Sequence, residues 1–147
     1  MTLHAPLDAA QAADKNLLIY NVLPGGWVRG PRITGEIVGP SADWLRVMPD
    51  GIAKLDVRAS IKADDGSIIY VTYAGRIVLS DAAARRQQSG ETLGADDMYF
   101  MTSPTFETMS ATYGWLNGVV AVGKMVSSKE PRAGEPGHVR YEIFSVA

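Results

Sequence analysis

The sequence predicts a mainly β protein that forms a single antiparallel β-barrel domain over residues 1–147. The first observation is the stretch from Trp44 to Arg76, where three runs of alternating apolar and polar residues are separated by two similar turns. The second is that most other segments are short and extended, with one short helix near residues 80–89. Many short strands with few helices are typical of barrels, and 147 residues suit one domain.

The run from Ala53 to Lys62 alternates strictly between apolar and polar residues. Successive side chains of a strand point to opposite faces, so this pattern indicates a strand. Pro49-Asp50-Gly51 precedes it, and Asp64-Asp65-Gly66 follows it. Both sequences suit three-residue hairpin loops in which a type I turn is followed by a glycine in the left-handed conformation.

Loops of this length fix the register of the three strands. They place Trp44 opposite Asp56, and Arg58 opposite Thr72. The side chains then separate into an aliphatic face and a polar face. The aliphatic face holds Leu45, Val47, Ala53, Leu55, Val57, Ala59, Ile61, Ile69, Val71 and Tyr73. The polar face holds Trp44, Arg46, Lys54, Asp56, Arg58, Ser60, Lys62, Tyr70, Thr72 and Arg76.

Two interpretations of the polar face remain open at this point. In the first, the face is simply solvated, as one face of an antiparallel sheet often is, and Asp56 and Arg58 form an exposed pair of little energetic value. In the second, the face is the inner wall of the barrel and carries a polar cluster. The aliphatic face would then point outward and need a cover, so the second interpretation predicts a homo-oligomer, most simply a dimer.

Composition excludes several classes of function. The net charge of −2, the pI near 5.6 and the lack of a Lys/Arg block argue against nucleic-acid binding. The chain has no cysteine and only two histidines, His4 and His138, so we expect no metal site and no histidine-based triad. No phosphate-binding glycine motif occurs, and we expect no cofactor. No signal peptide or membrane span is readable, which predicts a soluble cytoplasmic protein.

The first third of the chain has less regular patterns, so its secondary structure is predicted less sharply. Residues 7–15 are alanine-rich and are expected to form a helical turn or to fray, and we extend the expectation of fraying to residues 1–16. Leu17 to Val22 resembles a strand at a sheet edge. Trp27 to Val38 resembles a strand whose glycines allow bends or bulges.

The last part of the chain mixes one helix with further strands. The helix near 80–89 has Ser80 or Asp81 as its N-cap and Gly90 as its stop signal, and we expect its arginines to be solvated. The segments that follow are predicted as two extended pieces over 99–108 broken at Pro104, a strand over 115–125 and a closing strand over 139–146.

Several spaced motifs resemble a known family. They are GGWVRGPRITGEIVGPSADW, PDG, LDVR, DDG, IYVTYAG, YFMTSPTFET and YGWLN, in that order from Gly25 onward. This run resembles the bacterial and fungal family catalogued as domain of unknown function number 3237. The resemblance implies a small β-barrel similar to allene oxide cyclase and dirigent proteins, and it implies no settled activity.

The resemblance also supports the pocket interpretation of the polar face. Residues of the family pattern that are present here include Asp43-Trp44, Asp56, Arg58, Tyr70, Glu107, Trp115 and Asn117. Several of them fall on the predicted polar face, and clustered polar groups in a concave apolar site are typical of binding sites. Met101 stands where the family usually has arginine, which suggests a more apolar ligand.

Such a pocket would support proton-transfer chemistry. Asp56 is the candidate general base, Arg58 the candidate partner for an oxygen anion, Tyr70 a hydrogen-bond or proton donor, and Glu107 a second acid/base. The candidate substrate-binding residues are Trp44, Thr72, Tyr99, Trp115 and Asn117.

Simpler roles compete with some of these assignments. Core packing is favoured for Trp115, and hydrogen bonding to local backbone is favoured for Asn117 and Thr102. Turn formation is favoured for Asp43 and Asp50.

Two functions are consistent with these residues. The first is a cofactor-independent isomerase, cyclase or lyase, including hydration and dehydration, that acts on a hydrophobic carbonyl or phenolic compound. The second is a non-catalytic barrel that binds a similar small hydrophobic or aromatic molecule. Fold alone does not choose between them. A pKa of Asp56 shifted toward neutrality would favour catalysis, whereas a plain ion pair between Asp56 and Arg58 would favour a structural or binding role.

Overall fold

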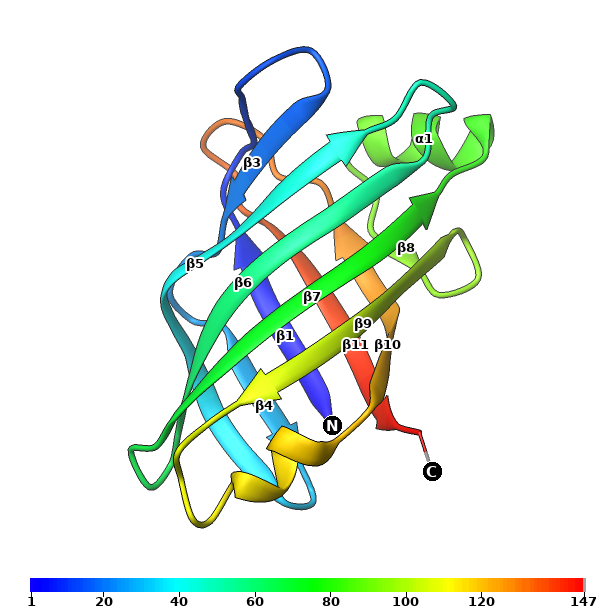
Figure 1. Cartoon of the computed structure of the whole chain (residues 1–147). Helices are drawn as coiled ribbons and strands as arrows, with labels where there is room; N and C mark the ends of the chain where they lie inside the picture. Colours follow the sequence, from blue (N-terminus) through cyan, green and yellow to red (C-terminus); the bar gives the residue numbers. More distant parts are fainter. Residues whose placement is uncertain (147) are drawn as a thin grey trace.

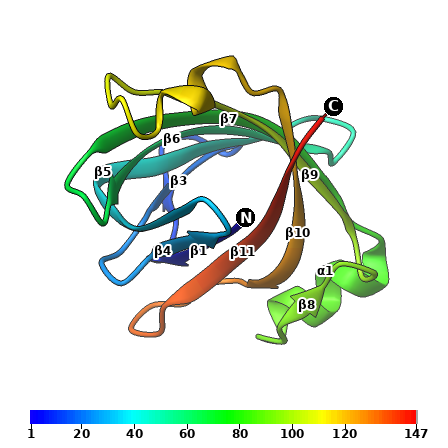
Figure 2. The ribbon, with the colours of Figure 1, turned by 90° about the horizontal axis from the view of Figure 1, so that it is seen from below.

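Eight antiparallel strands close into a barrel in the computed structural model, which describes residues 1–146 (Figures 1 and 2). Around the ring the order is β1–β4–β5–β6–β7–β9–β10–β11 and back to β1. The strands of the ring are β1 (Thr2–Leu7), β4 (Trp27–Gly30), β5 (Ile33–Val47), β6 (Ala53–Ala63), β7 (Ile68–Val78), β9 (Tyr99–Glu107), β10 (Ala121–Lys129) and β11 (Gly137–Ser145). The predicted fold class is therefore confirmed.

Shorter elements complete the two ends of the barrel. They are β2 (Gln11–Ala12), β3 (Leu17–Asn21), α1 (Asp81–Gln88), β8 (Leu93–Gly94) and the 3-10 helix η1 (Gly114–Gly118). β3 pairs with the second half of β5, where it continues the wall beyond β4, and a bridge between Leu7 and Val22 links this end to β1. The predicted fraying of residues 1–16 is wrong for β1, because β1 is hydrogen-bonded to β4 and β11.

The two predicted hairpin turns have the expected geometry. Met48 donates its N–H to Ile52 (2.9 Å), Ala63 donates to Ser67 (2.9 Å), and Gly51 and Gly66 have φ of +84° and +86°. The register follows, with Arg46 opposite Lys54 and Arg58 opposite Thr72. A left-handed glycine closes each turn, so local sequence is sufficient to set this pairing.

The aliphatic face lines the interior of the barrel. Leu55, Val57 and Ile61 of β6 are buried, and Ile61 is 0% exposed. The intervening side chains of Asp56 and Arg58 are 61% and 53% exposed. The predicted polar inner wall is therefore wrong. The interior of an eight-stranded barrel is narrow, with room for packed side chains and a small ligand at most, and aliphatic groups gain the most from burial there.

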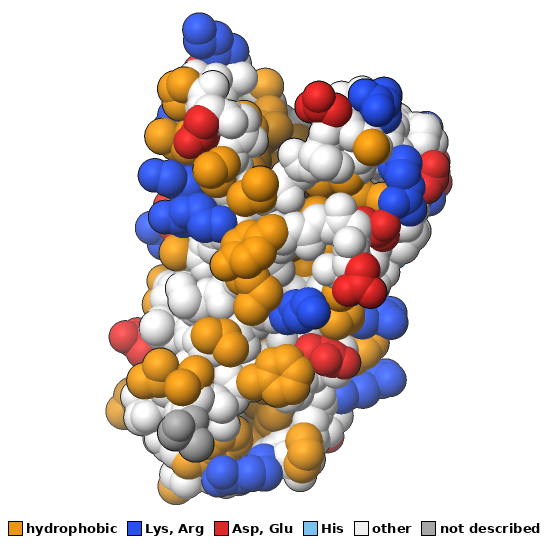
Figure 3. All heavy atoms as spheres, turned by 90° about the vertical axis from the view of Figure 1, so that its right-hand side faces the viewer, with side chains coloured by type: hydrophobic (Ala, Val, Ile, Leu, Met, Phe, Trp, Pro, Cys, Tyr) orange, Lys and Arg blue, Asp and Glu red, His pale blue; other side chains and the backbone are white. Residues whose placement is uncertain are grey.

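The reason for expecting a homodimer no longer applies, because the aliphatic face has its cover inside the barrel. On the side drawn in Figure 3, apolar side chains are intermixed with acidic and basic ones. Val122 and Phe144, paired across β10 and β11, are among the exposed apolar residues. The oligomeric state stays a prediction.

Helix α1 begins and ends where the sequence predicts. The Ser80 Oγ accepts a hydrogen bond from the Ala83 N–H (3.1 Å), and Gly90 follows the helix with φ of +88°. Arg86 is not simply solvated, since its guanidinium binds Asp97 (2.6 Å) and Glu91 (2.8 Å). These two ion pairs connect helix α1 to the loop that follows it.

Three other segments differ from the prediction. The strand predicted from Trp27 to Val38 is instead β4 and the start of β5, which pair with each other. β9 runs without a break through Pro104, because β10 pairs with β9 only at Met101 and Thr102 and leaves one edge of β9 unpaired beyond them. The predicted strand over 115–125 is instead η1 followed by β10, which begins at Ala121. β11 closes the barrel over nearly the predicted residues.

Candidate functional site

A row of inward-facing residues crosses three neighbouring strand pairs near one end of the barrel. Tyr20 on β3 is paired with Asp43 on β5, Asp43 with Val57 on β6, and Val57 with Tyr73 on β7. Paired residues of antiparallel strands present their side chains to the same face. The carboxyl group of Asp43 therefore lies between two tyrosines on the inner wall.

Tyr141 reaches this row from the opposite wall. It is buried on β11, and its ring meets the Tyr73 ring edge to face at 5.6 Å between centroids. It makes a similar contact with Phe100 on β9 at 5.5 Å. Such aromatic pairs hold both rings in place across the interior.

A cavity of about 60 Å³ lies against this row. Gln87 of α1 and residues 128–130 at the end of β10 contribute to its lining, which places it at the end of the barrel that carries α1 (Figure 1). Its wall is formed by Ala5, Leu7, Tyr20, Val22, Asp43, Leu45, Val57, Tyr73, Ile77, Gln87, Phe100, Ser128, Lys129, Glu130, Val139 and Tyr141. Most of these are apolar or aromatic, so Asp43 is a carboxyl group in a largely apolar wall.

Within residues 1–146, Asp43 has one hydrogen-bond donor and no cationic partner. Its Oδ1 accepts the backbone N–H of Asp56 at 3.1 Å, and none of the ion pairs between described residues includes it. Burial raises the pKa of Asp43 to about 7, the hydrogen bond from Asp56 opposes the rise, and the negative charge of Asp56 adds to it. Near neutral pH this carboxyl is therefore able both to accept and to release a proton.

The hydroxyl groups around Asp43 stay protonated at neutral pH. Burial raises the pKa of Tyr73 and of Tyr141, and the charge of Asp43 contributes to both shifts. Tyr20 donates its O–H to Glu130 Oε1 at 2.6 Å, which joins β3 to the end of β10 beside the cavity. Burial raises the pKa of Glu130 as well, although this hydrogen bond opposes the rise.

This arrangement combines a carboxyl base with neutral hydroxyl donors in a mostly apolar cavity. A carboxylate of this kind can remove a proton from carbon or oxygen, and a tyrosine O–H can stabilise the oxygen on which negative charge develops. Among residues 1–146 there is no group of three or more His, Asp or Glu side chains placed to hold a metal ion.

The residues that the sequence singled out lie on the outer surface instead. Asp56 and Arg58 form an open pair, with 3.8 Å between their nearest charged atoms, and the Arg58 guanidinium lies 5.4 Å from the Trp44 ring centroid. On the next strands, Tyr70 is paired with Glu107. Asp56 and Arg58 line one open groove, and Tyr70 and Glu107 line another. The expectation that Asp56, Arg58 and Tyr70 line one cavity is therefore wrong, and a functional role for them stays a prediction.

The predicted binding residues do not gather in one place. Thr72 shares a hydrogen bond with Thr105 (2.7 Å) on the outer face, and Tyr99 is 59% exposed. Asn117 bonds the backbone N–H and C=O of Thr108 (2.8 and 2.9 Å), which is the local role that was favoured for it. Trp115 lies on η1, at the end of the barrel opposite Asp43.

The sequence interpretation of Asp43 as a turn residue is wrong, although a signal was present. Asp43 shares the alternation of Leu45 and Val47, so it is an acidic residue on the aliphatic face of β5. Tyr73 also falls on that face. Asp50, in contrast, does form its turn and accepts the Ile52 N–H at 3.0 Å. Met101 alternates with the buried Phe100 and Thr102, so it faces away from the cavity and gives no information about a ligand there.

Comparison with known proteins places this barrel among uncharacterised relatives. A family model described as "Protein of unknown function (DUF3237)" matches residues 1–146. A UPF0311 protein from Rhodopseudomonas palustris is 29% identical over 118 residues, which cover 79% of this chain and 77% of that protein.

In the described chain, no helix has the length and apolar character needed to cross a bilayer.

Solved structures share the barrel. The crystal structure of the R. palustris protein matches 97% of this chain and 93% of its own with a TM-score of 0.79 at 24% identity. A beta-barrel like protein from Acinetobacter baumannii matches 99% of this chain and 92% of its own, with a TM-score of 0.71 and 26% identity. An enzyme from Penicillium herquei, at 19% identity and a TM-score of 0.60, covers 97% of this chain and 91% of its own and shares the fold alone.

Proposed function

This chain belongs to the DUF3237 family of proteins of unknown function, and we propose that it is a cofactor-independent enzyme. We propose an isomerase, cyclase or lyase that moves protons on a small hydrophobic carbonyl or phenolic compound. The reaction would take place in the cavity beside Asp43. The proposed reaction is the proton-transfer chemistry that the sequence predicts. We propose it for residues inside the barrel, however, and no longer for residues that lie on the outer face.

One observation supports the proposal above all others. Asp43, a carboxyl group that has no cationic partner in the described part of the chain, shares a mostly apolar cavity with the hydroxyl-bearing side chains of Tyr73 and Tyr141. Burying a carboxyl group without an ion partner destabilises a fold, so such groups are concentrated at functional sites. Its pKa near 7 suits a base that must also return the proton.

The proposed reaction follows from these positions. The Asp43 carboxylate removes a proton from the carbon next to a carbonyl group, and the C–H electron pair moves to form an enolate. Tyr73 and Tyr141 donate hydrogen bonds to the enolate oxygen and stabilise its charge. Asp43, now neutral, returns the proton to a different carbon in an isomerisation, or to a leaving hydroxyl group in a dehydration. The side chain of Asp43 ends each cycle ionised, as it began.

The size of the cavity limits the ligand. About 60 Å³ holds only a small group, so the reacting end of a substrate would enter while the remainder lies toward Gln87 and Lys129. Because the wall is largely aliphatic and aromatic, a hydrophobic ligand fits it better than a highly polar one.

The alternative function is a non-catalytic barrel that binds the same class of compound. The Tyr20–Glu130 hydrogen bond favours it, because this bond fixes two elements beside a narrow cavity and would slow ligand exchange. In that case Asp43 would serve as a hydrogen-bond partner for the ligand and would transfer no proton.

Proton exchange distinguishes the two functions. A panel of small enolisable ketones, from cyclopentanone to 1-indanone, is incubated with the protein in D₂O at pH 7, and ¹H NMR follows the loss of the protons next to the carbonyl. The wild-type protein should accelerate exchange, and Asp43→Asn should reduce the rate by about 10²–10⁴-fold. Tyr73→Phe should also slow it, whereas the outer-face variant Asp56→Asn should keep most of the rate.

Two results would argue against catalysis at this site. Equal exchange with wild type and Asp43→Asn would remove Asp43 as the base. Saturable binding of the same ketones without exchange would instead favour the binding barrel.

A further inference from the structure

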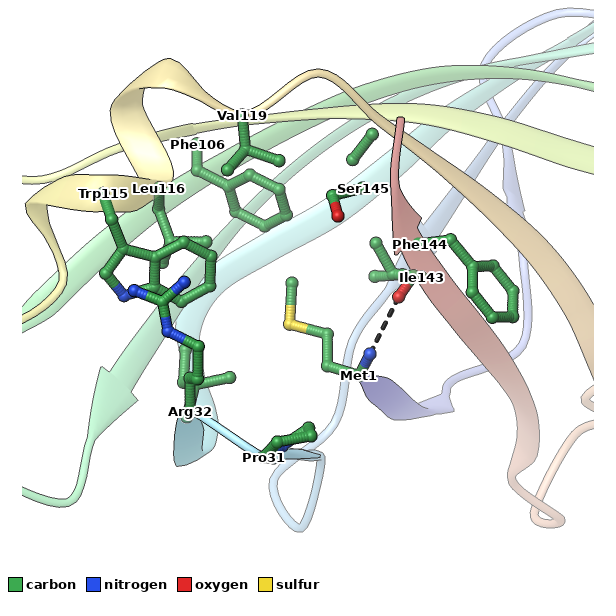
Figure 4. Close-up of a pocket in the computed structure, with 12 residues that line it drawn as sticks. Met1, Pro31, Arg32, Phe106, Trp115, Leu116, Val119, Ile143, Phe144 and Ser145 are labelled. Atoms are coloured by element: carbon green, nitrogen blue, oxygen red, sulfur yellow. Dashed lines mark hydrogen bonds between the residues drawn. The ribbon is translucent and has the colours of Figure 1, made fainter. Parts of the chain in front are cut away.

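A second, larger cavity lies at the opposite end of the barrel from Asp43. It has a volume of about 350 Å³ and is bounded by η1, the turn between β4 and β5, and the ends of β10 and β11 (Figure 4). This volume is within the range of small-molecule sites, whereas the cavity beside Asp43 is much smaller. None of the described residues lines both cavities.

The wall of this cavity is apolar. The side chains that point toward the gap in Figure 4 come from the N-terminal Met1, β9, η1, the segment after η1, and β11. They include Phe106, Leu116, Val119 and Ile143. Among the described residues that line it, none is acidic, and Arg32 is the one with a charged side chain.

The guanidinium of Arg32 is held at the edge of the cavity by Trp115. Its central carbon lies 3.8 Å from the centroid of the Trp115 ring, and Figure 4 shows the two groups side by side. Stacking uses the flat face of a guanidinium and leaves its N–H groups, which lie in the plane, free to donate. Within residues 1–146, the Arg32 side chain takes part in none of the ion pairs and in none of the hydrogen bonds that arginine side chains donate.

From these observations we propose that this cavity is a binding site for an amphipathic anion, a hydrophobic molecule that carries one carboxylate. The hydrocarbon part occupies the apolar cavity, and the carboxylate accepts paired N–H bonds from Arg32, whose orientation Trp115 fixes. The Ser145 side chain, also at this cavity, offers an additional hydroxyl. This site is separate from the proposed proton-transfer site and does not depend on it.

Octanoate and 1-octanol are suitable probes because they share a hydrocarbon chain and differ in charge. The chain has three tryptophans, and neither Trp27 on β4 nor Trp44 on β5 lines this cavity. In ¹H–¹⁵N NMR spectra, octanoate should therefore shift the indole N–H signal of Trp115 in a saturable way and leave the other two indole signals in place. Trp115→Phe identifies the signal by its loss.

A matched pair of arginine variants tests the role of the charge. Arg32→Gln should weaken octanoate binding by about tenfold, as expected for loss of a charge-assisted hydrogen bond, and leave octanol binding unchanged. Arg29→Gln is the control, because the Arg29 guanidinium stacks on Trp27 at 4.3 Å and does not line the cavity. It should leave both affinities unchanged.

Three results would overturn the proposal. They are an unshifted Trp115 signal in saturating octanoate, equal affinities of the wild-type protein for octanoate and octanol, and equal weakening by the two arginine variants. Arg32 is exposed, so Arg32→Gln is expected to fold, and unchanged Trp27 and Trp44 signals would verify this.

Discussion

Replacement of Asp43 by asparagine should stabilise the protein at pH 8 and leave its stability at pH 4 nearly unchanged. The amide has the shape of the carboxyl group, and its oxygen can still accept the N–H of Asp56. It cannot ionise, however, so the variant avoids burying a negative charge. At pH 4 the wild-type side chain is protonated in the folded protein, and the two proteins then resemble each other.

The magnitude follows from the pKa of Asp43 in the two states. It rises from 3.8, the ordinary value, to about 7 in the folded protein. Between these values the folded protein binds more protons than the unfolded chain, so the free energy of unfolding falls as pH rises. At about 1.4 kcal/mol for each pKa unit, ionised Asp43 destabilises the fold by about 4 kcal/mol above pH 7. Asp43→Asn should regain most of this.

Urea unfolding followed by tryptophan fluorescence, at intervals from pH 4 to pH 8, measures the difference. The gap between Asp43→Asn and wild type should open from near zero to its full value over this range. Asp96→Asn, at an exposed loop position, is the matched control and should stay within about 0.5 kcal/mol of wild type throughout. A gap that does not change with pH would refute the reasoning, because it would mean that Asp43 titrates normally.

Three further substitutions test other parts of the structure by the same unfolding assay. Tyr20→Phe leaves Glu130 without its hydrogen bond and should cost about 1–3 kcal/mol at pH 7; no loss would mean that water replaces the hydroxyl freely. Leu116→Ala opens a hole in the core and should cost about 2–5 kcal/mol, and a smaller loss would indicate that η1 collapses into the space. Arg58→Lys alters only an exposed pair with Asp56 and should change stability by less than about 1 kcal/mol; a larger effect would show that this pair stabilises the barrel.

Local sequence was sufficient for the hairpins and for the helix. The turns that end in Gly51 and Gly66 need a left-handed residue, and the cap of α1 needs the Ser80 hydroxyl, so a few neighbouring residues determine each feature. Alternation in β6 likewise separated the two faces of the sheet. Features of this kind depend on interactions between residues that are close in the sequence, so the local residue pattern is enough to predict them.

Which face lies inside could not be decided in the same way. Alternation is identical whether Asp56 points inward or outward, and the outcome depends on how eight strands close and how much aliphatic surface they bury. Predicting which residues form the site would have required knowledge of contacts between residues that are still further apart in the sequence. Tyr20, Asp43 and Tyr73 lie in one row only because β3, β5, β6 and β7 pair in a particular register, and Tyr141 joins them from the far wall.

The titration of the Asp43 carboxyl group tests the central claim most directly. The ¹³C chemical shift of its side-chain carboxyl carbon is followed by NMR from pH 3 to pH 9, and the signal is assigned by its loss in Asp43→Asn. We predict a midpoint near pH 7, because the carboxyl group is partly buried in a largely apolar cavity and has no cationic partner among residues 1–146. A midpoint near pH 4 would show that Asp43 is fully solvated or paired with a cation, and it would contradict the proposed role of this carboxyl as the base.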